Sequence, residues 1–309
     1  MSTLSQSSEE LPIERSGVVA LLGRPNVGKS TLVNALVGSK VSIVASKPQT
    51  TRHRITGIRH EPGCQMLLVD VPGLHGGKRS KALNRYMNRV ASTALDDVDL
   101  VLWLVEAGRW TEDDALALER VRDIKLPVGL VITKIDRIKH REDLLPFLQE
   151  MQQRLDATFT VPVSALKHSN LEPLLAEIRQ QLPEGPAFYP QAQLTDRDER
   201  FQAAEVIREK LIHALHQELP YALTVEVERY VQEEKGLAID AVIWVARKSH
   251  KGIVIGRQGE NLKRIGREAR MELKQQLKQA VHLGLWVKVR EGWADDERAL
   301  NSLGFNDLG

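Results

Sequence analysis

The chain has 309 residues, of which 42% are hydrophobic and 27% are charged, and its formal net charge is only +2. This length and composition allow two domains with substantial cores and exclude a wholly disordered chain. The single cysteine, Cys64, excludes an internal disulfide, and no apolar run approaches the roughly 18 to 20 residues that span a bilayer. Residues 1–10 are polar and acidic, unlike a signal peptide, so we expect a cytoplasmic protein.

The segment from Gly23 to Ser30 has the full G-x-x-x-x-G-K-S spacing of a phosphate-binding P-loop. The apolar run 17–22 predicts a buried strand before it, and the helical spacing of 31–37 predicts a helix after it. Backbone N–H groups and the positive end of that helix can surround phosphate oxygens. The sequence therefore predicts a nucleoside triphosphate ligand, held by Gly23, Arg24, Pro25, Asn26, Val27, Gly28, Lys29, Ser30 and Thr31.

A polar segment, 46–54, lies between two predicted strands, 41–44 and 55–58. Its low apolar content predicts a loop at the surface, in which a threonine could ligate the Mg²⁺ of the nucleotide and give its N–H to the terminal phosphate. Thr51 is our first choice for this role and Thr50 is the alternative. The competing interpretation is an ordinary basic surface loop.

The next predicted strand, 65–69, ends in Asp70, Val71, Pro72 and Gly73. A carboxylate at the tip of a strand beside a P-loop can hold Mg²⁺ through water, and a glycine lets backbone N–H approach the third phosphate. We therefore predict a metal site made of Ser30, Thr51 and Asp70. The predicted catalytic residues are Lys29, Thr51, Asp70 and Gly73.

Position 74 decides how the attacking water is oriented, because many GTPases with this loop have a glutamine there. In this chain the residue is Leu74, whose aliphatic side chain cannot orient water. We therefore predict slow intrinsic hydrolysis, at or below about one turnover per minute, as in unassisted switch GTPases.

Two further segments identify the base. The predicted strand 126–132 leads into Thr133, Lys134, Ile135 and Asp136. A carboxylate at Asp136 can accept from both N1–H and the exocyclic amine of guanine, a donor pair that adenine lacks, while the Lys134 stem can cover the ring. The predicted strand 158–163 ends in Ser164, Ala165 and Leu166, where a small residue lets a backbone N–H reach guanine O6. These segments favour GTP over the alternative, an ATP-dependent P-loop kinase.

In this order the segments resemble the translation-factor-related GTPases. The resemblance implies an α/β domain with a mostly parallel sheet and helices on both faces. One departure is Thr133, because the family usually has asparagine there, so we expect weaker nucleotide binding with guanine choice kept by Asp136. Asn26 resembles the asparagine that ligates potassium in some of these GTPases, which makes K⁺ a candidate second cation beside Mg²⁺.

The segment 182–190 is rich in proline and glycine and breaks every periodicity, so we place a domain boundary there. Beyond it, the sequence predicts a helix over 201–216 and strands over 222–230 and 237–246. The expected division is a flexible tail (1–14), a GTPase domain (15–183), a linker (184–198), an RNA-binding domain (199–290) and a C-terminal tail (291–309) without assignable chemistry.

A G-x-x-G loop, 256–259, lies between two helical segments, and a helix to about Ala280 and a strand over 285–289 follow. The order α-β-β-α-α-β with this loop resembles a type II KH domain, in which the loop clamps single-stranded RNA. From 244 to 290 there are twelve Lys and Arg and three Glu, a local net charge of +9. The predicted RNA contacts are Lys251, Gly252, Gly256, Arg257, Gln258, Gly259, Lys263 and Arg264.

Several apolar residues of this half could either fill the core or face bases. We expect Trp244 and Trp286 to be core residues rather than stacking platforms. For Ile253, Ile255, Leu262 and Ile265 both roles stay open.

A GTPase domain with Leu74, followed by a single KH module, resembles the Era family of bacterial GTPases over about residues 15 to 300. The resemblance implies a monomeric, GTP-hydrolysing RNA-binding switch. It also implies binding to the 3′ end of the small-subunit ribosomal RNA, a role in small ribosomal subunit assembly and peripheral contact with the inner face of the membrane. The residues leave one alternative open, an RNA-binding module whose guanine nucleotide is structural and rarely hydrolysed.

Overall fold

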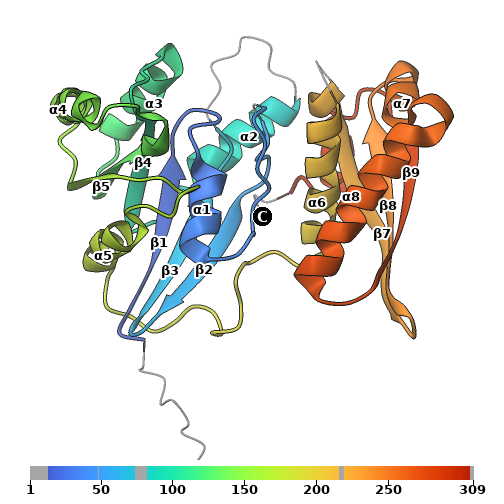
Figure 1. The fold of residues 1–309 in the computed structure, drawn as a ribbon, viewed down its shortest axis with the longest axis horizontal. Coiled ribbons are helices and arrows are strands. Elements are labelled where there is room, and N and C mark those ends of the chain that lie inside the picture. Colours follow the sequence, from blue (N-terminus) through green and yellow to red (C-terminus); the bar gives the residue numbers. More distant parts are fainter. Residues whose placement is uncertain (1–12, 48, 74–81, 216–218, 307–309) are drawn as a thin grey trace, which may run out of the picture.

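The structure is a computed structural model that describes residues 13–47, 49–73, 82–215 and 219–306. Within these residues the chain forms two sheets, each with its own helices, and a segment of the first half lies against helix α6 (Glu199–Ala214) of the second half (Figure 1). No helix of the described part is long and apolar enough to cross a membrane.

The first half is built on a six-stranded sheet in the order β2-β3-β1-β4-β5-β6. Strand β2 is antiparallel to β3 and the other pairs are parallel. The strands are β1 (Arg15–Leu22), β2 (Ile55–Glu61), β3 (Cys64–Asp70), β4 (Leu100–Glu106), β5 (Val128–Thr133) and β6 (Phe159–Pro162). Every residue of β3, β4 and β5 is buried, as the apolar runs predict for parallel strands that are covered on both faces.

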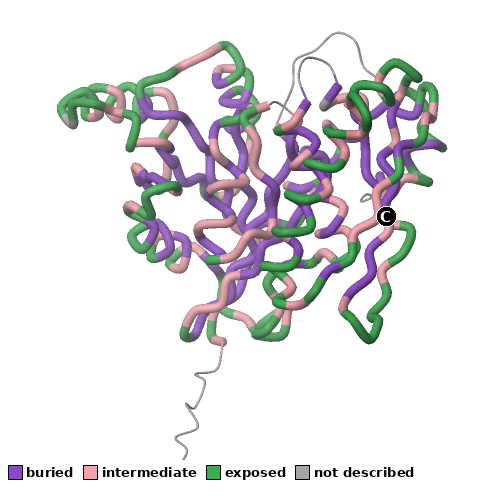
Figure 2. The backbone as a smooth tube through the Cα atoms, turned by 45° about the vertical axis from the view of Figure 1, so that its right-hand side comes forward, coloured by how far each residue is buried: buried purple, intermediate pink, exposed green. Residues whose placement is uncertain are grey.

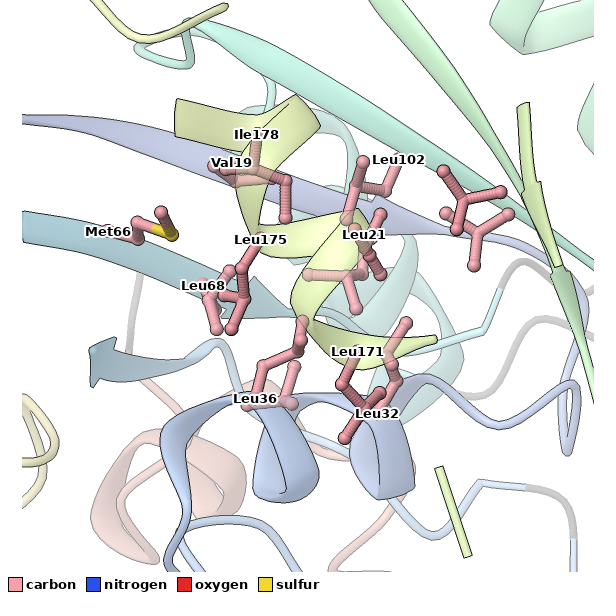
Figure 3. Close-up of a cluster of buried hydrophobic side chains, with 14 of the residues drawn as sticks. Val19, Leu21, Leu32, Leu36, Met66, Leu68, Leu102, Leu171, Leu175 and Ile178 are labelled. Atoms are coloured by element: carbon pink, nitrogen blue, oxygen red, sulfur yellow. The ribbon is translucent and has the colours of Figure 1, made fainter. Parts of the chain in front are cut away.

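Helices cover both faces of this sheet, which confirms the predicted architecture. They are α1 (Lys29–Val37), α2 (Ala82–Thr93), α3 (Glu112–Arg122), α4 (Leu144–Arg154) and α5 (Leu171–Gln181). Figure 3 shows one core layer, in which Leu32 of α1 and Leu175 of α5 pack with strand residues such as Val19. On the other face α3 and α4 pack against residues of β4 and β5 around Trp103. The buried strands form the centre of this half in Figure 2.

Residues 41–44 do not form a strand, so that prediction was wrong. Their backbone is bound by the side chain of Asn34, whose Oδ1 accepts from the N–H groups of Val41 and Ser42 at 2.9 Å. Ile43 is buried, and Val41 packs against the core layer beneath α1. The apolar residues therefore find burial, and the polar backbone finds partners, without a strand ladder.

The second half has the predicted order α-β-β-α-α-β. Its sheet runs in the order β7-β8-β9, with β7 antiparallel and β9 parallel to β8. The elements after α6 are β7 (Leu223–Glu233), β8 (Gly236–Val245), α7 (Lys248–Ile255), α8 (Glu260–Leu277) and β9 (Val281–Val289). Helices α6 and α8 cover one face of this sheet, and their shared core includes Ile207 and Ile265.

The C-terminal segment from 291 to 306 packs against the first half. Helix α9 (Glu297–Ser302) lies beside α2, and Trp293 and Phe305 are buried with Tyr86 and Met87 of α2. This segment is therefore a structural link between the two halves, which its acidic composition did not predict.

Candidate nucleotide site and RNA-binding groove

The P-loop connects β1 to α1, as predicted, and two of its glycines are required by geometry. Gly23 has φ +152° and Gly28 has φ +118°, and a Cβ at Gly23 would lie 2.8 Å from the Leu104 carbonyl oxygen. The buried Lys29 Nζ donates to the carbonyls of Gly23 (3.1 Å) and Arg24 (3.2 Å). Burial lowers the pKa of Lys29 to about 8. Its hydrogen-bond partners are neutral and the Asp70 carboxylate only partly offsets burial, so a phosphate group would supply further negative charge beside this ammonium group.

Three oxygen ligands meet beside the loop. Ser30 Oγ lies 2.5 Å from Asp70 Oδ2 and 2.9 Å from Thr51 Oγ1, and Thr51 Oγ1 lies 3.4 Å from Asp70 Oδ2. The other carboxylate oxygen, Asp70 Oδ1, is buried and has no hydrogen-bond partner among the described residues. Burial raises the pKa of Asp70, which a cation would reverse. Hard oxygen atoms in this arrangement fit Mg²⁺.

The structure distinguishes between the two threonines. Thr50 Oγ1 donates to the carbonyl of Lys47 at 2.7 Å, so that hydroxyl is occupied within its own loop. Thr51 is the one beside Ser30 and Asp70. Gly73 lies against the P-loop, since a Cβ there would be 3.0 Å from three atoms of Pro25. Leu74 lies outside the described residues.

The base-reading segment lies on the other side of the P-loop. Thr133 Oγ1 donates to the Val27 carbonyl (2.7 Å), and Lys134 Nζ donates to the Asn26 carbonyl (2.6 Å). Asp136 Oδ1 accepts from Ser164 Oγ at 2.5 Å, so the last two predicted segments meet as well. A cavity of about 490 Å³ joins these parts, and its lining includes Lys29, Ser30, Lys134, Asp136, Ala165 and Leu166. Its size suits a small ligand.

Sequence reasoning missed Glu106, which holds the P-loop and the base-reading segment together. Its carboxylate accepts from Arg24 (2.5 Å), Lys134 (2.9 Å) and Arg137 (3.0 Å). Burial opposes its ionisation, but Lys134 and Arg24 outweigh burial and hold the pKa of Glu106 below its usual range. Asp114 of α3 also binds Arg24, at 3.1 Å. The position of Glu106, a carboxylate at the end of a buried strand, was the available signal.

In the second half the G-x-x-G loop ends α7 and begins α8. Gly256 has φ +75° and Gly259 has φ +80°, and nothing lies within 4 Å of a Cβ at Gly259, so a chain could approach this backbone closely. A cavity of about 750 Å³ adjoins the loop, between α8 and β9. Of the predicted RNA contacts, Gly259 and Lys263 line it, together with Arg267 and Arg270, which were not predicted. The other six predicted RNA contacts do not line this cavity; they are Lys251, Gly252, Gly256, Arg257, Gln258 and Arg264.

The apolar residues near the loop divide between the two roles. Ile265 is fully buried in the core, and Leu262 lines the cavity. Ile255 packs against the core, whereas Ile253 is half exposed. The prediction that Trp286 belongs to the core was wrong, because 49% of this residue is exposed. Trp244 is half-buried and donates to Glu226 at 2.7 Å, outside the core cluster.

Comparison with known proteins agrees with both sites. A model of the 50S ribosome-binding GTPase family matches residues 18–134, and a KH domain model matches residues 218–294. The chain is 50% identical to GTPase Era of Stenotrophomonas maltophilia (strain K279a) over 298 residues, 96% of this chain and 99% of the relative. It is 48% identical to GTPase Era of Pseudomonas aeruginosa (strain LESB58) over 306 residues, 99% of this chain and 100% of the relative.

Two solved structures of Era share the whole architecture. A variant of Aquifex aeolicus Era bound to GDP and aluminium fluoride has a TM-score of 0.90. Era in complex with MgGDPNP and nucleotides 1506-1542 of 16S ribosomal RNA has a TM-score of 0.91. Each is 36% identical and covers 94% of this chain and 99% of its own. The phosphate loop, the guanine-reading segment and the KH domain, together with these relatives, establish that the chain is a GTPase with an RNA-binding domain and belongs to the Era family.

Proposed function

We propose that this protein is a GTP-controlled RNA switch that binds the 3′ end of the small-subunit ribosomal RNA during small ribosomal subunit assembly. The RNA target is supported by the solved Era relative that holds a 16S ribosomal RNA fragment. One observation carries the switch: the loop that brings Thr51 to Ser30 also binds the second half, because Arg208 of α6 donates to the Thr50 carbonyl at 2.5 Å. The nucleotide site and the RNA-binding domain therefore share one loop.

The residues divide the work of hydrolysis among them. Lys29 and the P-loop backbone bind the β- and γ-phosphates and neutralise negative charge as it moves to the leaving oxygen. Mg²⁺, held by Ser30, Thr51 and Asp70, would supply further positive charge there. The backbone of Gly73, beside Pro25, is placed to bind the terminal phosphate. Asp136 and Lys134 select and cover guanine. Release of Thr51 after hydrolysis would free its loop from the nucleotide site, and this loop is also bound to α6.

The switch is tested by measuring RNA affinity with a non-hydrolysable GTP analogue and with GDP. We expect the affinities to differ in the wild type and to become equal in Thr51→Ala, because that variant loses one of the three oxygen atoms around the metal. Thr50→Ala is the matched control and keeps the difference, since among the described residues its hydroxyl binds the Lys47 carbonyl alone. Equal affinities in the wild type would favour the alternative, a structural nucleotide.

We also propose that K⁺ assists the slow reaction. Asn26 Nδ2 donates to the Ser46 carbonyl at 2.8 Å, which leaves the amide oxygen to face a cation near the P-loop. With Leu74 unable to orient water, turnover of the purified protein is expected at or below about one per minute, and higher in potassium than in sodium buffer. Equal rates in the two buffers would exclude a role for K⁺ in the reaction. A rate of many turnovers per second would contradict the prediction of slow hydrolysis.

The protein is further proposed to be monomeric and cytoplasmic, with peripheral contact with the inner face of the membrane. The family resemblance alone supports these points. Fractionation of cells in low and high salt checks the membrane contact, because peripheral contact through charge is released by salt, and the mass of the purified protein in solution checks the monomer.

A further inference from the structure

The cavity beside the G-x-x-G loop does not end between α8 and β9. Its lining includes Leu262 and Gly266 of α8, but also Ala238 and Asp240 of β8. Side chains alternate along a strand, and the odd-numbered residues of β8 from 237 to 245 belong to the core beneath the helices. Ala238 and Asp240 therefore lie on the opposite face of the sheet, which we call the outer face. The cavity reaches both faces.

The cavity meets the edge of the sheet at Gly284. This residue pairs with Asp240 in the parallel register, and β9 is an edge strand of its sheet. A Cβ at Gly284 would lie 2.5 Å from Asp240 Oδ1 and 2.6 Å from the Trp286 ring. Glycine here makes room for the Asp240 carboxylate and the Trp286 ring, which fill the space that a side chain would take.

Trp286 lies directly against Gly284. Its ring packs against Gly284, with two ring atoms 2.6 and 2.8 Å from the site of a Cβ, and the residue is 49% exposed. Its neighbours Leu285 and Val287 face the core, so Trp286 belongs to the outer face. The indole thus contacts the strand at Gly284 while about half of the residue stays open to solvent.

The positive charges of α8 favour binding of a nucleic acid backbone along this helix. Among the described residues no carboxylate pairs with Lys263, Arg267 or Arg270, so these three cations are available for phosphates. On the outer face Arg229 is paired with Glu233 (2.5 Å) and Asp240 (3.6 Å). The positive charge is therefore concentrated on one wall of the groove, and the exposed indole lies beyond the opposite edge.

We propose that Trp286 is a stacking site for one base of single-stranded RNA, at the point where the strand leaves the KH groove and turns around β9 at Gly284. The backbone is bound by the G-x-x-G loop and the cations of α8, and the base stacks on the indole. Every base has a π-face, so this contact adds affinity with little dependence on sequence. The inference rests on the RNA binding proposed above and adds a site outside the groove between α8 and β9.

Affinity measurements provide the first test. The probe is a single-stranded RNA of about a dozen nucleotides from the 3′ end of the small-subunit ribosomal RNA, long enough to extend past the roughly four nucleotides that a KH loop clamps. Trp286→Leu is expected to lower affinity about tenfold, and Trp286→Phe less, because it keeps an aromatic ring. Met271→Ala is the matched control, an exposed apolar residue of α8 outside the cavity lining, and should bind as the wild type does.

A scan with abasic nucleotides locates the stacked base. One abasic position is expected to weaken binding to the wild type about tenfold and to leave binding to Trp286→Leu unchanged, since that contact is already lost. Equal affinity of Trp286→Leu and the wild type would overturn the proposal, and so would abasic losses that are the same in both proteins at every position.

Two controls separate this result from others. The double variant Lys263→Glu with Arg267→Glu should abolish binding. If the double variant loses binding and Trp286→Leu has no effect, only the stacking site is contradicted. If the wild type does not bind the probe, the proposed RNA function is contradicted. GTP turnover without RNA and the melting temperature report folding. If Trp286→Leu melts lower, the abasic scan is repeated with Trp286→Phe, where the loss at the same position should be smaller than in the wild type, and an equal loss would overturn the proposal.

Discussion

The hydroxyl group of Thr133 limits which atoms of the base this site can bind by hydrogen bonds. The residue is buried, and its single proton is given to the Val27 carbonyl at 2.7 Å, with the Val105 carbonyl at 3.2 Å. The Hoogsteen edge of guanine offers the acceptors N7 and O6. A hydroxyl whose proton is already used cannot donate to either, whereas an asparagine amide has two protons. Thr133 therefore ties the base-reading segment to the P-loop without reading the base.

This predicts that the wild type does not distinguish GDP from 7-deaza-GDP, which lacks the N7 acceptor. The two dissociation constants should agree within about twofold. Thr133→Asn should bind GDP about three- to tenfold more tightly and should then prefer GDP over the deaza analogue. Thr133→Val is the control and should weaken both nucleotides equally, because it loses the tie to Val27. A strong preference of the wild type for GDP would contradict this account. Isothermal titration calorimetry measures all of these values.

At the scale of elements, the segment from 40 to 54 is held on α6 by polar groups. Glu209 accepts from the Val44 N–H (2.9 Å) and from Lys40 (2.6 Å), and Lys47 donates to the Ile212 carbonyl (2.7 Å). Arg208 is 2% exposed and is clamped by both carboxylate oxygens of Glu205, each at 2.6 Å, while it donates to the Thr50 carbonyl. A buried ion pair in the second half therefore binds the backbone next to Thr51.

The ion pair also has a pH dependence. Burial alone would raise the pKa of Glu205, but Arg208 outweighs burial and holds that pKa below its usual range. A carboxyl group with a depressed pKa stabilises the fold above its ordinary pKa, and that stabilisation is lost as the pH falls through the lower value. The clamp is therefore intact at neutral pH.

Breaking the clamp should uncouple the two halves. Arg208→Met leaves Glu205 buried without its partner and should lower the free energy of unfolding by about 3–5 kcal/mol. Adding Glu205→Leu removes the unpaired charge and should restore most of that stability. Both variants should lose the difference in RNA affinity between the GTP analogue and GDP. Denaturant unfolding and RNA titration check the two parts, and a double variant with the full wild-type difference would show that coupling runs elsewhere.

At the scale of the whole molecule, the C-terminal segment connects the two halves. The Phe305 ring stacks on His53 with centroids 4.6 Å apart, and it meets Tyr86 of α2 edge-on at 5.5 Å. Trp293, which is fully buried, stacks on the same phenylalanine at 6.0 Å and donates to the Ala222 carbonyl at the start of the second sheet. One aromatic cluster thus touches both halves, and through His53 it reaches the loop that carries Thr51.

Phe305→Ala should therefore weaken the contact between the halves. Loss of this buried ring should cost about 3–5 kcal/mol in unfolding free energy, and the radius of gyration in small-angle X-ray scattering should increase. GDP affinity should stay as in the wild type, because the cluster does not line the nucleotide cavity. Asn301→Ala, an exposed residue of α9, is the control. An unchanged radius of gyration would mean that α6 alone holds the halves together.

Much of the fold could be predicted because the chain alternates apolar runs with turn signals. The order of elements in the second half and the strands named for the first half were predicted correctly, except for the segment 41–44, which failed because Asn34, not a neighbouring strand, binds its backbone. The C-terminal segment was missed because its buried residues are spread among acidic ones. Their burial depends on α2, more than 200 residues away in the chain.

The sequence by itself determined the chemistry of the P-loop, of Asp70 to Gly73 and of Thr133 to Asp136. These motifs act through the backbone and side chains of a few consecutive residues, whose spacing specifies how they can bind phosphate, metal and guanine. Only the tertiary structure decided that Thr51 rather than Thr50 joins Ser30, that Glu106 binds Arg24 and Lys134, and that Trp286 faces outward. A strand has two faces and a loop has two sides, and the choice between them is made by elements that pack from distant parts of the chain.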